Sequence, residues 1–194
     1  ATEIAPNMII KTNTERVRES RKTNLELLLS NHNGDCKAPC SLGCPANTDC
    51  QGYVGLIANG LHKAALKLVK DKIPLPASIG RVCPHPCESD CRRGLVEQPI
   101  AIKELKRFVG DRDLNSDDPY IPEIAKATGK KVAIIGGGPA GITLAFILAR
   151  KGFKVTLFDA HEKIGGVLRY GIPEYRLHNS IIDRYEEILI ELGV

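Results

Sequence analysis

The sequence predicts an α-helical domain followed by the first part of an α/β domain. Two observations support this prediction. All seven cysteines lie between Cys36 and Cys91, in a stretch whose apolar residues recur at helical spacing. After residue 130, short apolar runs alternate with a helical pattern and glycine-rich turns, which is typical of α/β domains. We therefore expect a helical domain over residues 1–110, a linker over residues 111–129 and an α/β domain from residue 130 to residue 194.

The composition excludes several classes of function. The net charge of the 194 residues is +4, and the basic residues form no long run and no pattern interleaved with aromatic residues. We therefore expect no nucleic-acid partner. No apolar run approaches the roughly 18 residues of a membrane-spanning helix, so we expect no membrane insertion. No signal peptide is visible, and the chain begins at Ala1 and contains a single βαβ pattern, so we expect a piece of a longer protein.

Apolar periodicity and capping residues predict the individual elements. The expected helices cover residues 14–31, 47–59, 61–72, 99–109, 142–152 and 179–192. Short strands are expected over residues 4–12, 132–135 and 154–158. Residues 73–82, which read IPLPASIGRV, and residues 164–177 are interpreted as loops because they are rich in proline and glycine.

The stretch KVAIIGGGPAG, residues 131–141, carries the strongest motif. Gly136, Gly138 and Gly141 form G-x-G-x-x-G between an apolar strand and a helix, and Asp159 follows the first glycine by 23 residues. These glycines would permit a tight turn, the approach of a pyrophosphate and close packing of helix on strand, while the acid would accept hydrogen bonds from a ribose. An unrelated glycine turn is the alternative, and the spacing of strand, helix and acid argues against it.

The cysteines form two groups with a repeated spacing of four positions. The first group is His32, Cys36, Cys40 and Cys44 with Cys50 beyond, and the second is Cys83, Cys87 and Cys91. The odd number of cysteines and the lack of a secretion signal argue against disulfides and favour a cytoplasmic, reducing compartment. Seven cysteines and one histidine are enough ligands for two 4Fe–4S clusters, which take four each. Zinc or free thiols are the alternatives, although neither group has the Cys-x-x-Cys spacing that is usual for zinc.

Several stretches resemble known families. Residues 35–111, with GRVCPHPCESDCRRG and IAIKELKRFVGD, resemble the N-terminal cluster domain of the glutamate synthase small subunit, of dihydropyrimidine dehydrogenase and of NADH-dependent ferredoxin–NADP oxidoreductases. Residues 131–194, with GGGPAG, IGGVLRYGIPEYRL and ELGV, resemble the Rossmann-like FAD-binding domain of the same proteins. The upstream stretch ERVRESRKTNLELLLSNHNGDC is similar to the His-Cys cluster segment in the large iron–sulfur subunit of NADH-quinone oxidoreductase, in some formate dehydrogenases and in iron hydrogenases.

The resemblance to dihydropyrimidine dehydrogenase implies two sets of cluster ligands. One set is His32, Cys36, Cys40 and Cys91, and the other contains Cys44, Cys83 and Cys87. The family's fourth ligand of the second cluster is a Gln or Glu, and the aligned residue here is Lys106, which cannot ligate iron. We expect Cys50 to replace it, with Glu104 as the alternative.

The resemblance also implies FAD rather than NAD at the βαβ unit. The residues expected to contact FAD are Gly136, Gly138, Pro139, Ala140, Gly141, Asp159, Gly166, Val167 and Arg176. Arg169 is interpreted equally well as a ligand contact or as a solvated charge. The family's NAD(P)H domain would follow in the full-length protein.

These resemblances imply an α-helical iron–sulfur cluster domain joined to the first part of a Rossmann-like FAD-binding domain. The implied function is electron transfer between FAD and 4Fe–4S clusters in an NAD(P)H-dependent oxidoreductase complex, with electron bifurcation to ferredoxin as a further expectation. The implied partners are other redox subunits, ferredoxin-like or NADH-dehydrogenase-like. Two alternatives stay open, namely an NADPH-dependent glutamate synthase small subunit and a non-catalytic docking scaffold held together by clusters.

Overall fold

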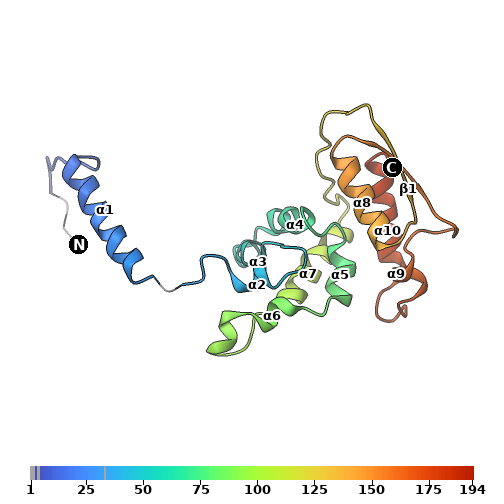
Figure 1. Ribbon diagram of the computed structural model, residues 1–194, viewed down its shortest axis with the longest axis horizontal. Coiled ribbons are helices and arrows are strands. Elements are labelled where there is room, and N and C mark those ends of the chain that lie inside the picture. The colour runs from blue at the N-terminus through green and yellow to red at the C-terminus, as the bar shows by residue number, and fades with distance from the viewer. Residues whose placement is uncertain (1–2, 4, 33) are drawn as a thin grey trace. The chain divides into compact units, whose positions relative to one another are not determined.

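The structure is a computed structural model that describes residue 3, residues 5–32 and residues 34–194 (Figure 1). The chain divides into two compact units, residues 1–36 and residues 37–194, and each is described by itself. Within the described residues, no helix combines the length and the hydrophobicity needed to cross a membrane.

The first unit contains helix α1, Glu15–Ser30. It begins where the sequence predicts, because the side chain of Thr14 caps it by accepting a hydrogen bond from the Val17 N–H. None of its residues is buried, and its leucines are exposed. The strand expected over residues 4–12 is wrong for residues 5–12, which form a turn and irregular backbone, and Ile4 lies outside the described residues.

The second unit begins with short helices and one longer helix. Their bounds are α2 Pro39–Leu42, α3 Cys50–Ala58, α4 His62–Lys70, α5 Pro76–Val82, α6 Pro86–Ser89, the 3-10 helix η1 Arg92–Leu95 and α7 Ile102–Leu114. The predicted helices over residues 47–59, 61–72 and 99–109 correspond to α3, α4 and α7. Helix α7 starts later than predicted and continues past residue 109 to Leu114.

The loop expected over residues 73–82 is wrong from residue 76 onward, because Pro76–Val82 forms helix α5. Proline is compatible with the first turn of a helix, where Pro76 lies. Gly80 of α5 and Gly110 of α7 lie where the two helices cross closely, and Gly80 does not form a turn. A Cβ at Gly110 would lie 2.6 Å from the backbone N of Ala77, and a Cβ at Gly80 would lie 2.6 Å from the Cβ of Arg107.

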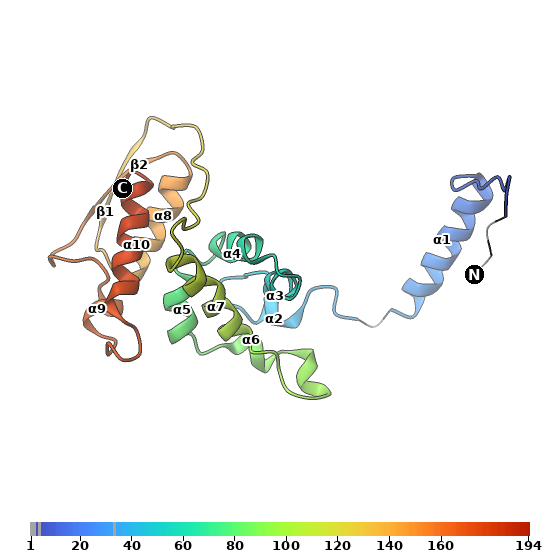
Figure 2. The ribbon, with the colours of Figure 1, turned by 180° about the vertical axis from the view of Figure 1, so that it is seen from behind.

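The βαβ unit forms as predicted. Strands β1, Lys131–Ile135, and β2, Lys154–Phe158, pair in parallel with Lys131 opposite Lys154 and Ile135 opposite Phe158. Helix α8, Pro139–Arg150, connects them and packs on both strands. Two further helices follow, α9 Val167–Tyr170 and α10 Asn179–Glu191, and α10 packs against α8 (Figure 2). Helix α9 is a short interruption of the loop predicted over residues 164–177.

A shared hydrophobic core joins the cysteine-bearing helices to the βαβ unit within the second unit. Leu75 and Ala77, at the start of α5, belong to the same buried cluster as Phe146 of α8 and Leu189 of α10. The backbone N–H of Ala77 donates a 2.9 Å hydrogen bond to the buried hydroxyl of Tyr185. Helix α5 therefore links the cysteine-bearing helices to the α/β part of this unit, because it packs on α10 and is followed directly by Cys83.

Candidate functional site

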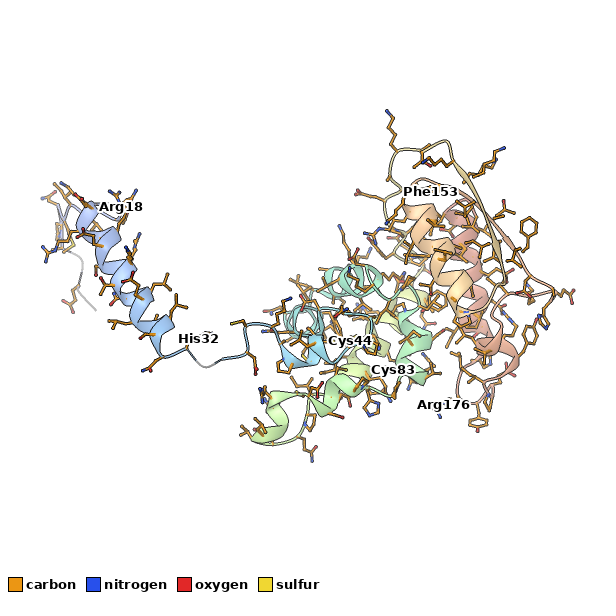
Figure 3. The ribbon with its side chains drawn as sticks, viewed as in Figure 1. Arg18, His32, Cys44, Cys83, Phe153 and Arg176 are labelled. Carbon is orange, nitrogen blue, oxygen red and sulfur yellow. The ribbon has the colours of Figure 1, made fainter. Side chains whose placement is uncertain are left out.

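Six cysteines of the second unit lie in or beside its short helices. Their positions are Cys40 in α2, Cys44 just after it, Cys50 at the start of α3, Cys83 at the end of α5, Cys87 in α6 and Cys91 before η1. Helix α2 packs against α3 and α6, which brings the two sequence groups together. Figure 3 labels Cys44 and Cys83, one from each group, among these helices. All seven cysteines of the chain are free thiols.

Cys50 is the most buried of these thiols, with 2% of its surface exposed. Burial raises its pKa to about 12, and the neighbouring thiols of Cys87, Cys44 and Cys40 add to this shift. The Ser41 hydroxyl accepts a hydrogen bond from the Cys50 N–H, which fixes the start of α3. Cys50 therefore lies among residues of both cysteine groups and stays protonated unless a positive centre binds it.

Cys44 differs from its neighbours because its pKa lies below the ordinary value. Burial acts to raise this pKa, but the backbone and hydroxyl of Thr48, together with the charge of Lys106, lower it by more. Thr48 is fully buried, and its hydroxyl makes no well-formed hydrogen bond to any residue that the structure describes. A buried donor beside a thiol is suited to a sulfur that carries negative charge.

Lys106 lies on the buried stripe of α7 that also carries Ile102 and Val109, which share a buried cluster with Cys50 and Cys87. Only 5% of the Lys106 surface is exposed. Burial raises the pKa of Cys87, whereas the Lys106 ammonium opposes that rise and also lowers the pKa of Cys44. The family resemblance aligned Lys106 with a cluster ligand, whereas no sequence pattern marked the Thr48 hydroxyl as a neighbour of Cys44, four residues before it.

The predicted alternative ligand Glu104 is half exposed and is directed to other partners. Its carboxylate lies 3.2 Å from Lys103 Nζ and 3.6 Å from Arg107 Nη1. Cys50, by contrast, is buried against Cys87 and Cys44. The geometry of the second unit therefore favours Cys50 over Glu104 as a partner for these cysteines.

The first unit carries the other two predicted metal ligands, His32 and Cys36. His32 follows the end of α1, as Figure 3 shows, and its Nε2 lies 3.6 Å from the Cys36 sulfur. Both side chains are exposed. In the described part of the chain, no three His, Cys, Asp or Glu side chains are placed as ligands of a single metal ion. The two predicted ligand sets stay predictions.

The G-x-G-x-x-G loop has the shape that its glycines predict. Gly136 has a φ of +104°, and a Cβ built there would meet no atom within 4 Å. At Gly138 the nearest atom to such a Cβ is the Cα of Gly166, at 4.0 Å. A Cβ at Gly141 would overlap the Gly136 carbonyl. The space over Gly136 and Gly138 can admit a phosphate, and Gly141 permits close packing of helix on strand.

Pro139 and Ala140 form the first turn of α8, which follows this loop directly. Backbone N–H groups in the first turn of a helix lack partners within the helix and favour anions. Their position is therefore compatible with the predicted contact to a phosphate.

Asp159 closes the loop from the end of β2. Its Oδ2 accepts a 2.6 Å hydrogen bond from the Gly137 N–H, and its Oδ1 accepts a 2.8 Å bond from the His161 N–H. These bonds, that from His161 first, hold the pKa of the Asp159 carboxyl below its usual value. Asp159 therefore organises the loop, a role that sequence reasoning missed, and its contact with a ribose stays a prediction.

The remaining predicted contacts lie around α9. A Cβ at Gly166 would lie 2.8 Å from the Cα of Gly138, so these two segments touch through glycines. Val167 begins α9 and is more than half exposed, and Arg176 is exposed (Figure 3). Arg169 is held in place, because its Nε donates to the Ile164 carbonyl at 2.8 Å and its guanidinium pairs with Asp183.

Comparison with known proteins identifies two matching domains. Residues 10–118 match the family described as dihydropyrimidine dehydrogenase domain II, 4Fe–4S cluster. Residues 134–181 match the NAD(P)-binding Rossmann-like domain. The fold expected from the sequence, a helical 4Fe–4S domain followed by a Rossmann-like segment, is therefore confirmed.

Several curated proteins match most of this chain. The chain is 40% identical over 178 residues to the NADP(+)-dependent formate dehydrogenase subunit beta of Moorella thermoacetica, covering 81% of this chain and 25% of that protein. It is 39% identical over 161 residues to the NADPH-Fe(3+) oxidoreductase subunit beta of Geobacter sulfurreducens (81% and 24%). It is also 36% identical over 154 residues to the glutamate synthase [NADPH] small chain of Bacillus subtilis (78% and 31%). The chain thus spans about a quarter to a third of these relatives.

Proposed function

This chain belongs to the dihydropyrimidine dehydrogenase domain II family of 4Fe–4S proteins, and from that premise we propose that it transfers electrons in an NAD(P)H-dependent oxidoreductase. The observation that carries the proposal is the position of helix α5. It packs on α10 through Ala77, α10 in turn packs on helix α8 of the βαβ unit, and Cys83 directly follows the last residue of α5. A redox group at the βαβ unit and one at the cysteines of the second unit would therefore be bound within one compact unit.

The chemistry of the donor set in the second unit supports the proposal of a 4Fe–4S cluster there. Cys44, Cys50, Cys83 and Cys87 supply four thiols from four separate segments. The Thr48 hydroxyl and the Lys106 ammonium, both buried, supply a hydrogen-bond donor and a positive charge that act on the Cys44 thiol. A bound cluster supplies one-electron transfer. The protein's own contribution is to hold the four thiols, exclude water and stabilise negative charge on sulfur.

His32, Cys36, Cys40 and Cys91 are proposed as ligands of a second cluster, on the strength of the family resemblance. The 3.6 Å approach of His32 and Cys36 within the first unit supports their pairing. A neutral imidazole ligand would give this cluster less negative charge than four thiolates, which favours a higher potential.

FAD is proposed at the βαβ unit, with contacts from the G-x-G-x-x-G loop, Asp159 and the segment Gly166, Val167 and Arg176. The open space over Gly136 and Gly138 supports a pyrophosphate there. Flavins link the two-electron chemistry of NAD(P)H to one-electron carriers, so FAD suits a protein that also holds clusters. NAD(P)H would bind in a part of the full-length protein outside this chain.

The relatives named as a subunit beta or a small chain support the proposal that this protein acts with partner subunits. The free thiols favour a reducing compartment, and we place the protein in the cytoplasm. Bifurcation to ferredoxin is proposed only on the resemblance. A glutamate synthase small chain is the second candidate, favoured by the 36% identity to the Bacillus subtilis protein.

The test is a flavin assay and an anaerobic reduction on the full-length protein, with the variant Gly138→Ala. Gly138 has a φ of −76°, and an added Cβ meets no protein atom closer than 4.0 Å, so the variant should fold. It should lose most of its FAD and its reduction by NADPH, while keeping iron and sulfide. Full retention of flavin in the variant, or no flavin in the wild type, would overturn FAD binding at this loop.

A further inference from the structure

Lys106 lies on the core-facing stripe of α7 rather than on its solvent side. The buried residues of this helix are Ile102, Lys106, Val109, Gly110, Asp113 and Leu114. Two of them carry charge, and Asp113 is paired with Lys70. Lys106 precedes Asp113 by seven residues, which is about 10 Å along a helix, so it belongs to a different environment.

The carboxylates around Lys106 are directed elsewhere. Glu104 pairs with Lys103 and Arg107 on the surface of α7. Glu88 of α6 accepts a 2.8 Å hydrogen bond from the Lys103 N–H, and its other oxygen lies 3.7 Å from His85 Nε2. Among the residues that the structure describes, no carboxylate lies within ion-pair distance of the Lys106 ammonium.

A buried cation without a counter-charge is costly, by several kcal/mol for an ion that has lost its water. Ile102 and Val109, on the same buried stripe of α7 as Lys106, belong to the buried cluster that contains Cys50 and Cys87 and against which Cys44 packs. The positive charge of Lys106 also acts to lower the pKa of the Cys44 and Cys87 thiols. Helix α6, which carries Cys87, packs on α7, and the Glu88–Lys103 bond fixes that contact. The lysine therefore lies in the same buried region as thiols that become negative when they ligate iron.

We infer that Lys106 is the buried counter-charge of the cluster proposed to be held by Cys44, Cys50, Cys83 and Cys87, and that it raises the reduction potential of that cluster. The inference rests on the proposed function. Lys106 is not an iron ligand here, since an ammonium has three donors and no acceptor. It is a positioning and charge-stabilising residue.

The physical reason is the charge change on reduction. One electron, from reduced flavin in the protein or from dithionite in an experiment, adds one negative charge to the cluster and its thiolates. Inside a protein, where the effective dielectric constant is far below that of water, a nearby fixed cation stabilises the more negative state. Removing the cation should therefore make this cluster harder to reduce and leave a cluster with other ligands unchanged.

The experiment compares the full-length, anaerobically reconstituted wild-type protein with three variants. Lys106→Met removes the charge and keeps the length of the side chain, and Lys106→Arg restores a cation. Lys72→Met, at an exposed lysine beside Asp71, is the matched control. Iron and acid-labile sulfide are measured first, and the potential of each cluster signal is then obtained by electron paramagnetic resonance during a dithionite titration.

Lys106→Met should shift one signal to a more negative potential at unchanged iron content, while Lys106→Arg and Lys72→Met stay near the wild type. Loss of one cluster in the Met variant, with retention in the Arg variant, would equally support a required positive charge. Unchanged potentials, or loss of the cluster from both Lys106 variants, would overturn the inference alone. A wild-type protein without iron and sulfide would overturn the proposed function and the inference together.

Discussion

The ammonium of Lys70 lies 2.6 Å from Oδ2 of Asp113, and both side chains are almost fully buried. The same ammonium donates to the Tyr120 carbonyl at 2.9 Å, and the other Asp113 oxygen accepts from the Tyr120 N–H at 2.6 Å. One ion pair therefore fixes α4, α7 and the start of the segment that leads to the βαβ unit.

Breaking this pair should strongly destabilise the protein. Lys70→Met leaves the Asp113 carboxylate buried without its cation, and the expected loss is about 3–5 kcal/mol in the free energy of unfolding. The double variant Lys70→Met, Asp113→Leu should recover much of that loss, because no isolated charge remains. Urea denaturation of the three proteins measures both values, and equal stability of the single variant and the wild type would contradict the structural role.

The crossing of α5 and α7 depends on Gly110. Gly110→Ala places a Cβ against the backbone of Ala77, so we expect a loss of about 1–3 kcal/mol. Gly55→Ala is the matched control, since it lies within α3 and its Cβ would meet no atom within 4 Å. That variant should gain up to about 1 kcal/mol from helix propensity. Thermal unfolding distinguishes the two, and a neutral Gly110→Ala would contradict the close crossing.

Thr48→Val tests the buried hydroxyl beside Cys44. In the cluster-free protein the hydroxyl lacks a well-formed partner, so its removal should leave the free energy of unfolding unchanged or raise it by about 1 kcal/mol. In the cluster-bound protein the variant loses a donor to sulfur, and the cluster potential should fall. Chemical denaturation and a redox titration provide the two measurements. A clear loss of stability in the cluster-free variant would show that the hydroxyl has a structural partner instead.

Because of Asp159, the free energy of unfolding should depend on pH in the acid range. Its folded pKa is lowered from the ordinary 3.8, so the folded state binds fewer protons than the unfolded state. The resulting stabilisation is fully present above the unfolded pKa of 3.8 and is lost as the pH falls through the pKa of the folded state. The stability difference between the wild type and Asp159→Asn should therefore be constant from neutral pH to about pH 5 and shrink below it. A difference that persists unchanged to pH 2 would exclude this linkage.

Local patterns predicted the elements whose signals lie close together in the sequence. The βαβ unit was found because the glycines, the apolar runs and Asp159 act through local geometry, and Thr14 marked the start of α1. Helix α5 was missed because its proline and glycine residues predict a loop. Pro76 instead lies in the first turn of the helix, and Gly80 lies where α5 crosses α7. The burial of Lys106 and Thr48 was not predicted, because it depends on how α7 and the cysteine-bearing helices pack, which no spacing rule reveals.

The most direct test of the account is the iron and acid-labile sulfide content of the anaerobically purified full-length protein and of its Cys50→Ala variant, together with electron paramagnetic resonance of the reduced samples. The account predicts that residues 1–194 contribute two cluster signals to the wild type, and that the variant loses one signal and about four irons. Glu104→Gln, at the exposed alternative ligand, should lose neither. An unchanged Cys50→Ala variant would contradict the proposed ligand, and zinc without sulfide in the wild type would contradict electron transfer through this domain.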